Sequence, residues 1–219
     1  MTFAIRSLIR RGATGGVALT AVGALAAAGR APVAMAESPN TATFTSPATF
    51  VAVTRKMINA EVTTSGSPAP VLTQTGKPAW LHFTLGSARS PGTAHLSGNP
   101  PAGVIGAVSF TVSATNGSGT PTDQVVTLDI LGFTTTNGGS FTIGQPGSFT
   151  VAVPNSLSGV SMSAPVIPPH LAGLAFVDNG DGTGTLSGTP VAGDKSSPLR
   201  VRASLGGRTV SQTFRIAIG

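Results

Sequence analysis

Short runs of alternating apolar and polar residues recur along the chain from about residue 41 to its end. Residues 108–114 (VSFTVSA) and 214–218 (FRIAI) are two such runs. Successive side chains of a β-strand point to opposite faces, so alternation turns every second side chain toward a shared interior. No run has the 3.6-residue period of a helix, and the pattern predicts an all-β protein. Residues 141–143 and 149–153 are predicted to pair with each other across the Gly-rich turn between them.

The strand pattern occurs twice, about 90 residues apart. Residues 94–100 (AHLSGNP) match residues 184–190 (GTLSGTP), and each match is followed by a small loop, an alternating strand, a glycine turn and a final strand. Copies of this length suit a sandwich of two sheets with about seven strands. We therefore predict two tandem β-sandwich domains, residues 37–131 and 132–219.

The first 36 residues differ from the rest in composition. A basic start (Arg6, Arg10, Arg11) precedes a long uncharged stretch rich in Ala and Gly, and an Ala-x-Ala pattern ends at Ala36. These features are typical of a secretory signal peptide, and we expect cleavage after Ala36. The alternative is an uncleaved anchor helix, which the richness in Ala and Gly disfavours. A cleaved leader predicts a secreted or cell-surface protein that is released or held non-covalently.

Removal of the leader changes the charge balance. The whole chain has 13 Lys and Arg and 7 Asp and Glu, but four of the arginines belong to the leader, which leaves a net charge of +2. So small an excess does not indicate a nucleic-acid partner. The chain has no Cys, which excludes thiolate nucleophiles, Cys-ligated zinc and disulfides. The fold must therefore be held by its apolar core.

One run of sequence resembles a known family. Residues 176–190 (FVDNGDGTGTLSGTP), with residues 66–70 (GSPAP) of the first copy, are similar to the pattern of bacterial Ig-like domains of the cadherin-like group. The resemblance implies two immunoglobulin-like/cadherin-like sandwiches of the kind that secreted and surface proteins use as spacers, adhesion modules or appendages to enzymes. The first copy departs from the pattern, because residues 86–92 (GSARSPG) replace the acidic turn.

The acidic turn at residues 178–182 (DNGDG) raises the question of calcium. An EF-hand loop starting at Asp178 needs an oxygen ligand at its third position and Glu at its twelfth, where Gly180 and Thr189 stand. Asn-Gly and Asp-Gly instead favour a tight hairpin turn. The cadherin-like resemblance keeps calcium-dependent adhesion open as an alternative, although we expect no cofactor. The weak candidate ligands are Asp178, Asp181 and Asp129.

Catalytic motifs are missing from the sequence. The three histidines, His82, His95 and His170, lie outside any Gly-x-Ser-x-Gly or His-Glu-x-x-His motif, and no carboxylate pair has the context of a glycosidase. We therefore expect that the protein is not an enzyme. His82 is expected to face solvent, since it alternates with two apolar neighbours.

Arginines gather in the second copy. Arg200 and Arg202 flank Val201, Arg215 lies between two apolar residues, and a Gly-Gly turn separates the two strands. If these strands pair as a hairpin, the three arginines share one outer face. We hypothesise that this face binds an anionic cell-envelope polymer such as a wall polysaccharide or teichoic acid. The alternative is a solvated face that protects a sheet edge.

Three functions remain open from the sequence. The first is a structural or adhesive module whose partner is a cell-envelope polysaccharide or another surface protein. The second is a glycan-binding or cell-wall-binding module that uses the arginine face, and the third is calcium-dependent cadherin-like adhesion. No membrane contact is expected except through an uncleaved leader.

Overall fold

A computed structural model describes residues 40–117 and 119–219 of the chain. The predicted signal peptide and its cleavage site lie outside the described residues. The described residues belong to one compact unit. The described part contains fifteen strands and one short 3-10 turn, Pro169–Leu171, so the all-β prediction is confirmed. Its helical content includes nothing long and apolar enough to cross a membrane.

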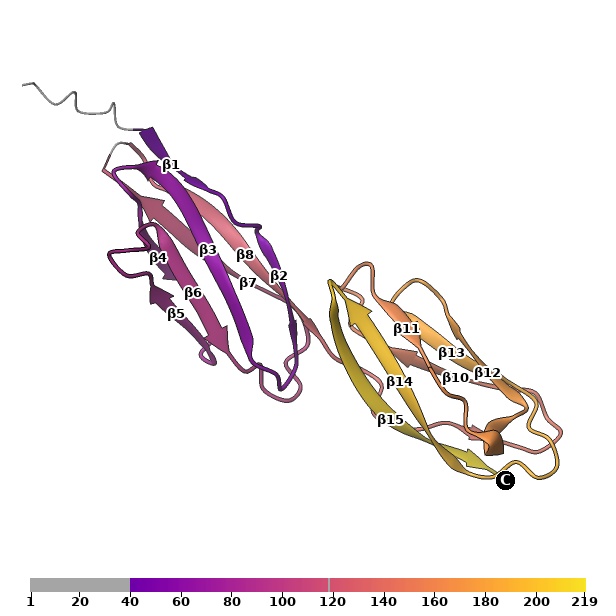
Figure 1. The fold of residues 1–219 in the computed structure, drawn as a ribbon. Helices are drawn as coiled ribbons and strands as arrows, with labels where there is room; N and C mark the ends of the chain where they lie inside the picture. The colour runs from indigo at the N-terminus through magenta and orange to yellow at the C-terminus, as the bar shows by residue number, and fades with distance from the viewer. Residues whose placement is uncertain (1–39, 118) are drawn as a thin grey trace, which may run out of the picture. The chain divides into compact units, whose positions relative to one another are not determined.

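The strands fall into two groups along the chain (Figure 1). The first group consists of β1 (Asn40–Phe44), β2 (Thr49–Val53), β3 (Ile58–Ser67), β4 (Val71–Thr75), β5 (Leu81–Leu85), β6 (Thr93–Gly98), β7 (Gly106–Thr115) and β8 (Thr122–Leu131). The second group consists of β9 (Ser140–Phe141), β10 (Gly147–Ala152), β11 (Ser161–Ser163), β12 (Leu174–Asp178), β13 (Thr183–Gly188), β14 (Ser197–Leu205) and β15 (Arg208–Ile218).

The first group forms two sheets with the strand orders β1-β3-β6-β5 and β2-β8-β7-β4. Neighbouring strands are antiparallel, except that β2 runs parallel to β8. In an immunoglobulin domain, the first, second, fifth and fourth strands form one sheet, and the third, sixth and seventh form the facing sheet. The first sandwich has this arrangement when β1 and β2 are counted as two halves of the first strand. The first sandwich is therefore Ig-like.

The second group repeats this topology. Its sheets have the orders β10-β13-β12 and β11-β14-β15-β9, which correspond to β3-β6-β5 and β4-β7-β8-β2 of the first sandwich. Strand β9 runs parallel to β15, as β2 does to β8. The strand order from β2 to β8 is therefore repeated by β9 to β15, whereas β1 has no counterpart in the second sandwich.

The predicted pairing of residues 141–143 with 149–153 is wrong. Strand β9 pairs with β15 in one sheet, and β10 pairs with β13 in the facing sheet. The backbone N–H groups of Ile143 and Gly144 donate to the carbonyl oxygens of Gly219 and Pro190, at 3.0 and 2.9 Å. The turn therefore carries the chain from one sheet to the other, and an alternating pattern cannot distinguish such a crossing from a hairpin.

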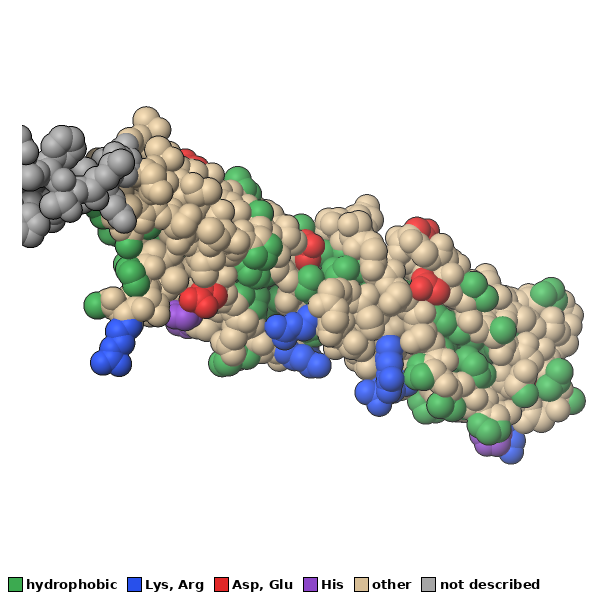
Figure 2. Space-filling model, turned by 45° about the horizontal axis from the view of Figure 1, so that its top comes forward, with side chains coloured by type: hydrophobic (Ala, Val, Ile, Leu, Met, Phe, Trp, Pro, Cys, Tyr) green, Lys and Arg blue, Asp and Glu red, His purple; other side chains and the backbone are tan. Residues whose placement is uncertain are grey.

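Two apolar cores hold the sandwiches together. The first core is built around Ile58, Leu96 and Leu128, all buried. The second has Phe214 at its centre, and the rings of Phe133 and Phe149 meet it edge-on with centroids 5.6 and 5.7 Å away. Burial of each large apolar side chain contributes about 1.5–3 kcal/mol to folding. Charged side chains are sparse on the surface that Figure 2 draws.

The repeated Leu-Ser-Gly-x-Pro segment has a steric reason. Gly98 lies opposite Leu81 across β5 and β6, and Gly188 lies opposite Leu174 across β12 and β13. A Cβ atom on Gly98 would lie 2.4 Å from the carbonyl oxygen of Trp80, and one on Gly188 would lie 2.2 Å from that of Gly173. Their φ angles, +157° and +147°, also disfavour other residues. Both copies therefore need glycine at this point.

We expect Gly188→Ala to lower the free energy of unfolding by about 2 kcal/mol, through the backbone collision and the strained φ angle. Chemical denaturation followed by fluorescence or circular dichroism measures the change. Gly119→Ala is the matched control, because its nearest atom beyond the flanking residues would lie 3.6 Å from the new Cβ. Equal stability of the Gly188 variant and the control would contradict this explanation of the repeat.

Candidate functional site

Strands β14 and β15 form the predicted hairpin and place the three arginines on one face. Arg200 lies opposite Thr213, and Arg215 lies opposite Pro198, two residues from Arg200 along β14. Arg200, Arg202 and Arg215 are exposed, whereas the residues that alternate with them are buried. Arg200 and Arg202 are about 7 Å apart along the strand, and Arg215 is a diagonal neighbour of Arg200 at a similar distance. We call this surface the arginine face.

Hydroxyl groups surround the cations of the arginine face. Arg202 lies between Ser163 of β11 and Ser211 of β15, and Thr213 stands beside Arg200. The four strands of this sheet contain no Asp or Glu. The positive charge is therefore not compensated within the sheet, and the face combines the donors that bind anions with hydroxyls that bind other polar groups.

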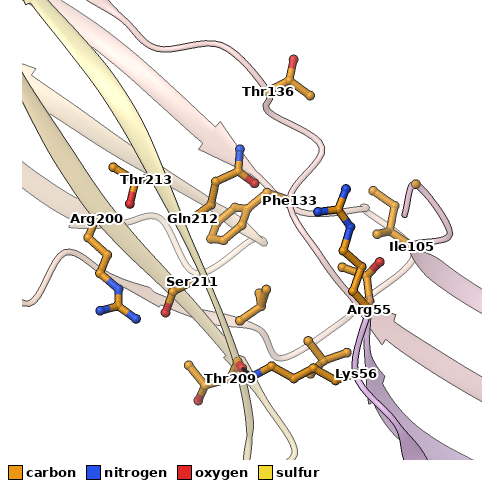
Figure 3. A pocket seen from close by; sticks show the side chains of 14 residues that line it. Arg55, Lys56, Ile105, Phe133, Thr136, Arg200, Thr209, Ser211, Gln212 and Thr213 are labelled. Atoms are coloured by element: carbon orange, nitrogen blue, oxygen red, sulfur yellow. Dashed lines mark hydrogen bonds between the residues drawn. The ribbon is translucent and has the colours of Figure 1, made fainter. Parts of the chain in front are cut away.

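A surface pocket of about 760 Å³ opens beside the arginine face (Figure 3). Three cations line it: Arg55, Lys56 and Arg200, and no acidic residue is among the lining residues. The neutral polar lining consists of Thr54, Thr136, Thr209, Ser211, Gln212 and Thr213. The remaining lining residues are Val53, Ile105, Phe133, Val210 and Gly103. The volume is in the range of small-molecule sites.

The turn between β2 and β3 carries two of these cations. Arg55 has a φ angle of 60° and is the one non-glycine residue with positive φ in the described ranges. Its N–H donates to the Pro100 carbonyl at 2.8 Å, and the Lys56 N–H donates to the Val53 carbonyl at 3.1 Å. The Lys56 ammonium also reaches the Thr209 carbonyl at 3.4 Å. The backbone bonds thus fix the turn in a conformation that arginine rarely adopts.

A second cavity lies further along the arginine face. It has a volume of about 310 Å³ and is lined by Ser196, Ser197, Pro198, Thr213 and Arg215. Thr213 also lines the larger pocket. The two cavities are therefore neighbours on one surface, and arginine is present at both.

The candidate calcium ligands serve the hairpin turn between β12 and β13. Asp178 accepts hydrogen bonds from the N–H groups of Met162 and Gly180, at 2.8 and 3.1 Å. Asp181 accepts from the N–H and the hydroxyl of Thr183, at 2.9 and 2.6 Å. The hairpin prediction for this segment is confirmed. Asp129 lies on β8, opposite Val51 and Ala107, and within the described ranges no three acidic or His side chains are close enough to hold a metal ion.

We expect the melting temperature to be the same in millimolar calcium and in chelator, because backbone groups and Thr183 already occupy the carboxylates of the turn. Thermal unfolding followed by circular dichroism is the measurement. An increase in melting temperature that saturates with calcium, and is lost in Asp178→Asn, would contradict the expectation and favour the cadherin-like alternative.

Two aspartates are expected to titrate on opposite sides of the ordinary pKa of 3.8. The Thr183 hydroxyl, and then the Thr183 N–H, lower the pKa of Asp181 because they stabilise its charged form. Burial raises the pKa of Asp129. Asp181 therefore favours folding above its unfolded-state pKa, and this contribution is lost as the pH falls through its folded-state value, whereas Asp129 acts in the opposite sense. Carboxyl NMR titration measures both midpoints, and Thr183→Ala should move only that of Asp181 toward 3.8.

Asp194 has a role that sequence reasoning missed. Its buried carboxylate accepts hydrogen bonds from the N–H groups of Val191, Ala172 and Gly173, at 3.0, 3.2 and 3.3 Å. These bonds tie the loop before β14 to the 3-10 turn. The first copy has Val104 at the equivalent point of its loop. This difference between an acidic and an apolar residue was the sequence signal that could have pointed to Asp194.

The histidines lie on separate elements. His82 is exposed on β5, as the alternation predicted, and His95 is exposed on β6 between Glu61 and Thr84. His170 is exposed in the 3-10 turn. The structure therefore brings none of them to the pocket or to the arginine face.

No protein-family model and no curated protein matches the sequence. The solved structures similar to it include the endo-fucoidan hydrolase MfFcnA4 of glycoside hydrolase family 107, with 19% identity over 81% of this chain and a TM-score of 0.35. This chain spans 28% of that hydrolase chain.

Tandem Ig domains are also among the similar structures. A pair from titin is 12% identical over 83% of this chain and 98% of its own, and the tandem Ig repeats of Dlar are 13% identical over 82% and 98%; both have a TM-score of 0.35. Similarity at this level carries no argument about function. The Ig-like fold of this chain rests on its own strand order and register.

Proposed function

We propose that this chain is an exported, non-catalytic Ig-like module that serves as a structural spacer or adhesion module at the bacterial cell surface or in the medium. One observation carries the proposal: apolar side chains fill the interiors of both sandwiches. Groups that can recognise a partner are therefore confined to the outer faces and loops, as in domains that act by surface contact.

The sequence supports the exported location and the class of partner. The leader-like segment before Glu37 and the resemblance to bacterial cadherin-like Ig domains both favour a surface or secreted protein. The partner under this proposal is a cell-envelope polysaccharide or another surface protein. The low net charge of residues 37–219 disfavours nucleic acid.

Cell fractionation of a bacterium that expresses the full-length gene tests the proposal. We expect the protein in the wall fraction or the medium with Glu37 at its N-terminus, and we expect Ala36→Arg to block the cleavage. Purified protein should bind isolated cell envelopes without hydrolysing generic ester, peptide or glycoside substrates. Retention in the cytoplasm, or turnover of such a substrate by the purified protein, would overturn the proposal.

A second candidate function is glycan binding by the arginine face. The observation that favours it is the gathering of Arg200, Arg202 and Arg215 among hydroxyls in a sheet without carboxylates. We expect the triple Ala variant to elute earlier than the wild type from a column of immobilised anionic glycan. Equal retention of the two proteins would end this candidate.

A further inference from the structure

We propose that the pocket beside the β2–β3 turn binds an anionic substituent of a polysaccharide, a carboxylate or a sulfate, as the anchoring subsite of the arginine face. This inference deepens the glycan-binding candidate and rests on it. It adds Arg55 and Lys56, which come from the other sandwich and were absent from the sequence-based site.

The pocket is lined by positive charges that no acidic residue of the lining compensates. Figure 3 shows Arg55 and Arg200 on different sides of the pocket, with Ser211 and Thr209 between them. In the described part of the chain neither guanidinium has an ion-pair or hydrogen-bond partner. An arginine fork binds carboxylate and sulfate oxygens through two parallel hydrogen bonds. The pocket therefore presents two guanidinium groups without partners, one on each side, and the Lys56 ammonium, which bonds to the Thr209 carbonyl.

The backbone conformation at Arg55 also points to a role in binding. Fourteen other described residues have positive φ angles, and all of them are glycines. A glycine would suit this turn better than arginine does, because the left-handed conformation raises the free energy of arginine but not of glycine. Such conformations gather at binding sites, where the side chain itself is required. Fold stability alone does not account for an arginine at this position.

The rest of the lining selects a saccharide from among polyanions. Threonine and serine hydroxyls can exchange hydrogen bonds with sugar hydroxyls, and the half-buried Ile105 can contact the C–H face of a sugar ring. A single-stranded nucleic acid would need exposed aromatic rings for stacking, and Phe133, the aromatic residue of this lining, is only 9% exposed.

The path beyond the pocket suits a polymer. Thr213 lines both the pocket and the smaller cavity at Arg215, and Arg200 stands beside it. The cations therefore continue along the surface at a spacing of about 7 Å. A chain with a negative substituent on successive sugars can place one group in the pocket and the next ones on the arginine face.

Isothermal titration calorimetry on the protein from the full-length gene tests the assignment. The probes are trigalacturonate for carboxylate, a sulfated dextran oligosaccharide for sulfate, and neutral dextran as the blank. Three double variants remove two positive charges each: Arg55→Gly/Lys56→Gln in the pocket, Arg202→Gln/Arg215→Gln on the arginine face, and Lys77→Gln/Arg89→Gln in the first sandwich. Glycine at position 55 suits the positive φ, so the pocket variant is expected to fold.

We expect the pocket variant to bind at least one anionic probe with a Kd about tenfold higher or more, whereas the first-sandwich control keeps the wild-type Kd. Loss of affinity in the arginine-face variant alone would overturn the pocket and leave the glycan-binding candidate standing. Equal weakening in all three variants would overturn both, since it indicates unspecific attraction. Wild-type binding to phosphatidylglycerol vesicles but to neither anionic glycan would also overturn both.

Discussion

Phe214→Ala is expected to lower the free energy of unfolding by about 3–5 kcal/mol, the largest single loss that we predict for this chain. Phe214 is 1% exposed and joins Phe133 from the segment before β9 with Phe149 of β10. Its removal leaves a cavity and also breaks two edge-to-face contacts, each worth about 0.5–1.5 kcal/mol.

Denaturation in guanidinium chloride measures this loss. Val177→Ala is the matched control in the same sandwich, because its side chain is 55% exposed and its truncation should cost less than about 0.5 kcal/mol. A loss below about 1 kcal/mol for Phe214→Ala would show that this ring is not at the centre of the second core.

Asp194→Ala is expected to cost about 3 kcal/mol. The substitution leaves three backbone N–H groups in the loop without their acceptor, and each was bonded to a charged group. The loop then loses its connection to the 3-10 turn that ends at Leu171, itself part of the second core.

Asp194→Asn is the matched variant for this prediction. The amide keeps one acceptor oxygen at nearly the same position and loses the other, so we expect a smaller loss than for alanine. Thermal unfolding and amide hydrogen exchange at Val191, Ala172 and Gly173 report the effect. Unchanged exchange at all three amides in Asp194→Ala would contradict the assigned role.

Local pattern and internal repetition were enough to predict much of the fold. Strict alternation around Val201 and Phe214 gave the inward and outward faces of β14 and β15, and the glycines at 206 and 207 gave their pairing. The turn at residues 178–182 followed from Asn-Gly and Asp-Gly chemistry. These features depend on neighbouring residues, which is the information that a single sequence holds most directly.

The features that sequence reasoning missed depend on segments distant in the chain. The partner of β9 is β15, with Ser140 opposite Ala217, and no local pattern specifies that choice. The pocket joins the turn at Arg55 with Phe133 and with the hairpin at Arg200. The positive φ of Arg55 could not be predicted either, because arginine disfavours it and only the surrounding backbone bonds impose it.

The central claim is that residues 40–117 and 119–219 form two Ig-like sandwiches that share one strand order apart from β1, each with a parallel pair, β2 with β8 and β9 with β15. Cross-strand NOEs in the NMR spectrum of the labelled protein test it most directly. We predict NOEs between Phe141 and Ile218 and between Ala52 and Ile130, in parallel register. NOEs that instead place Phe141 opposite β10 in an antiparallel hairpin would contradict the claim.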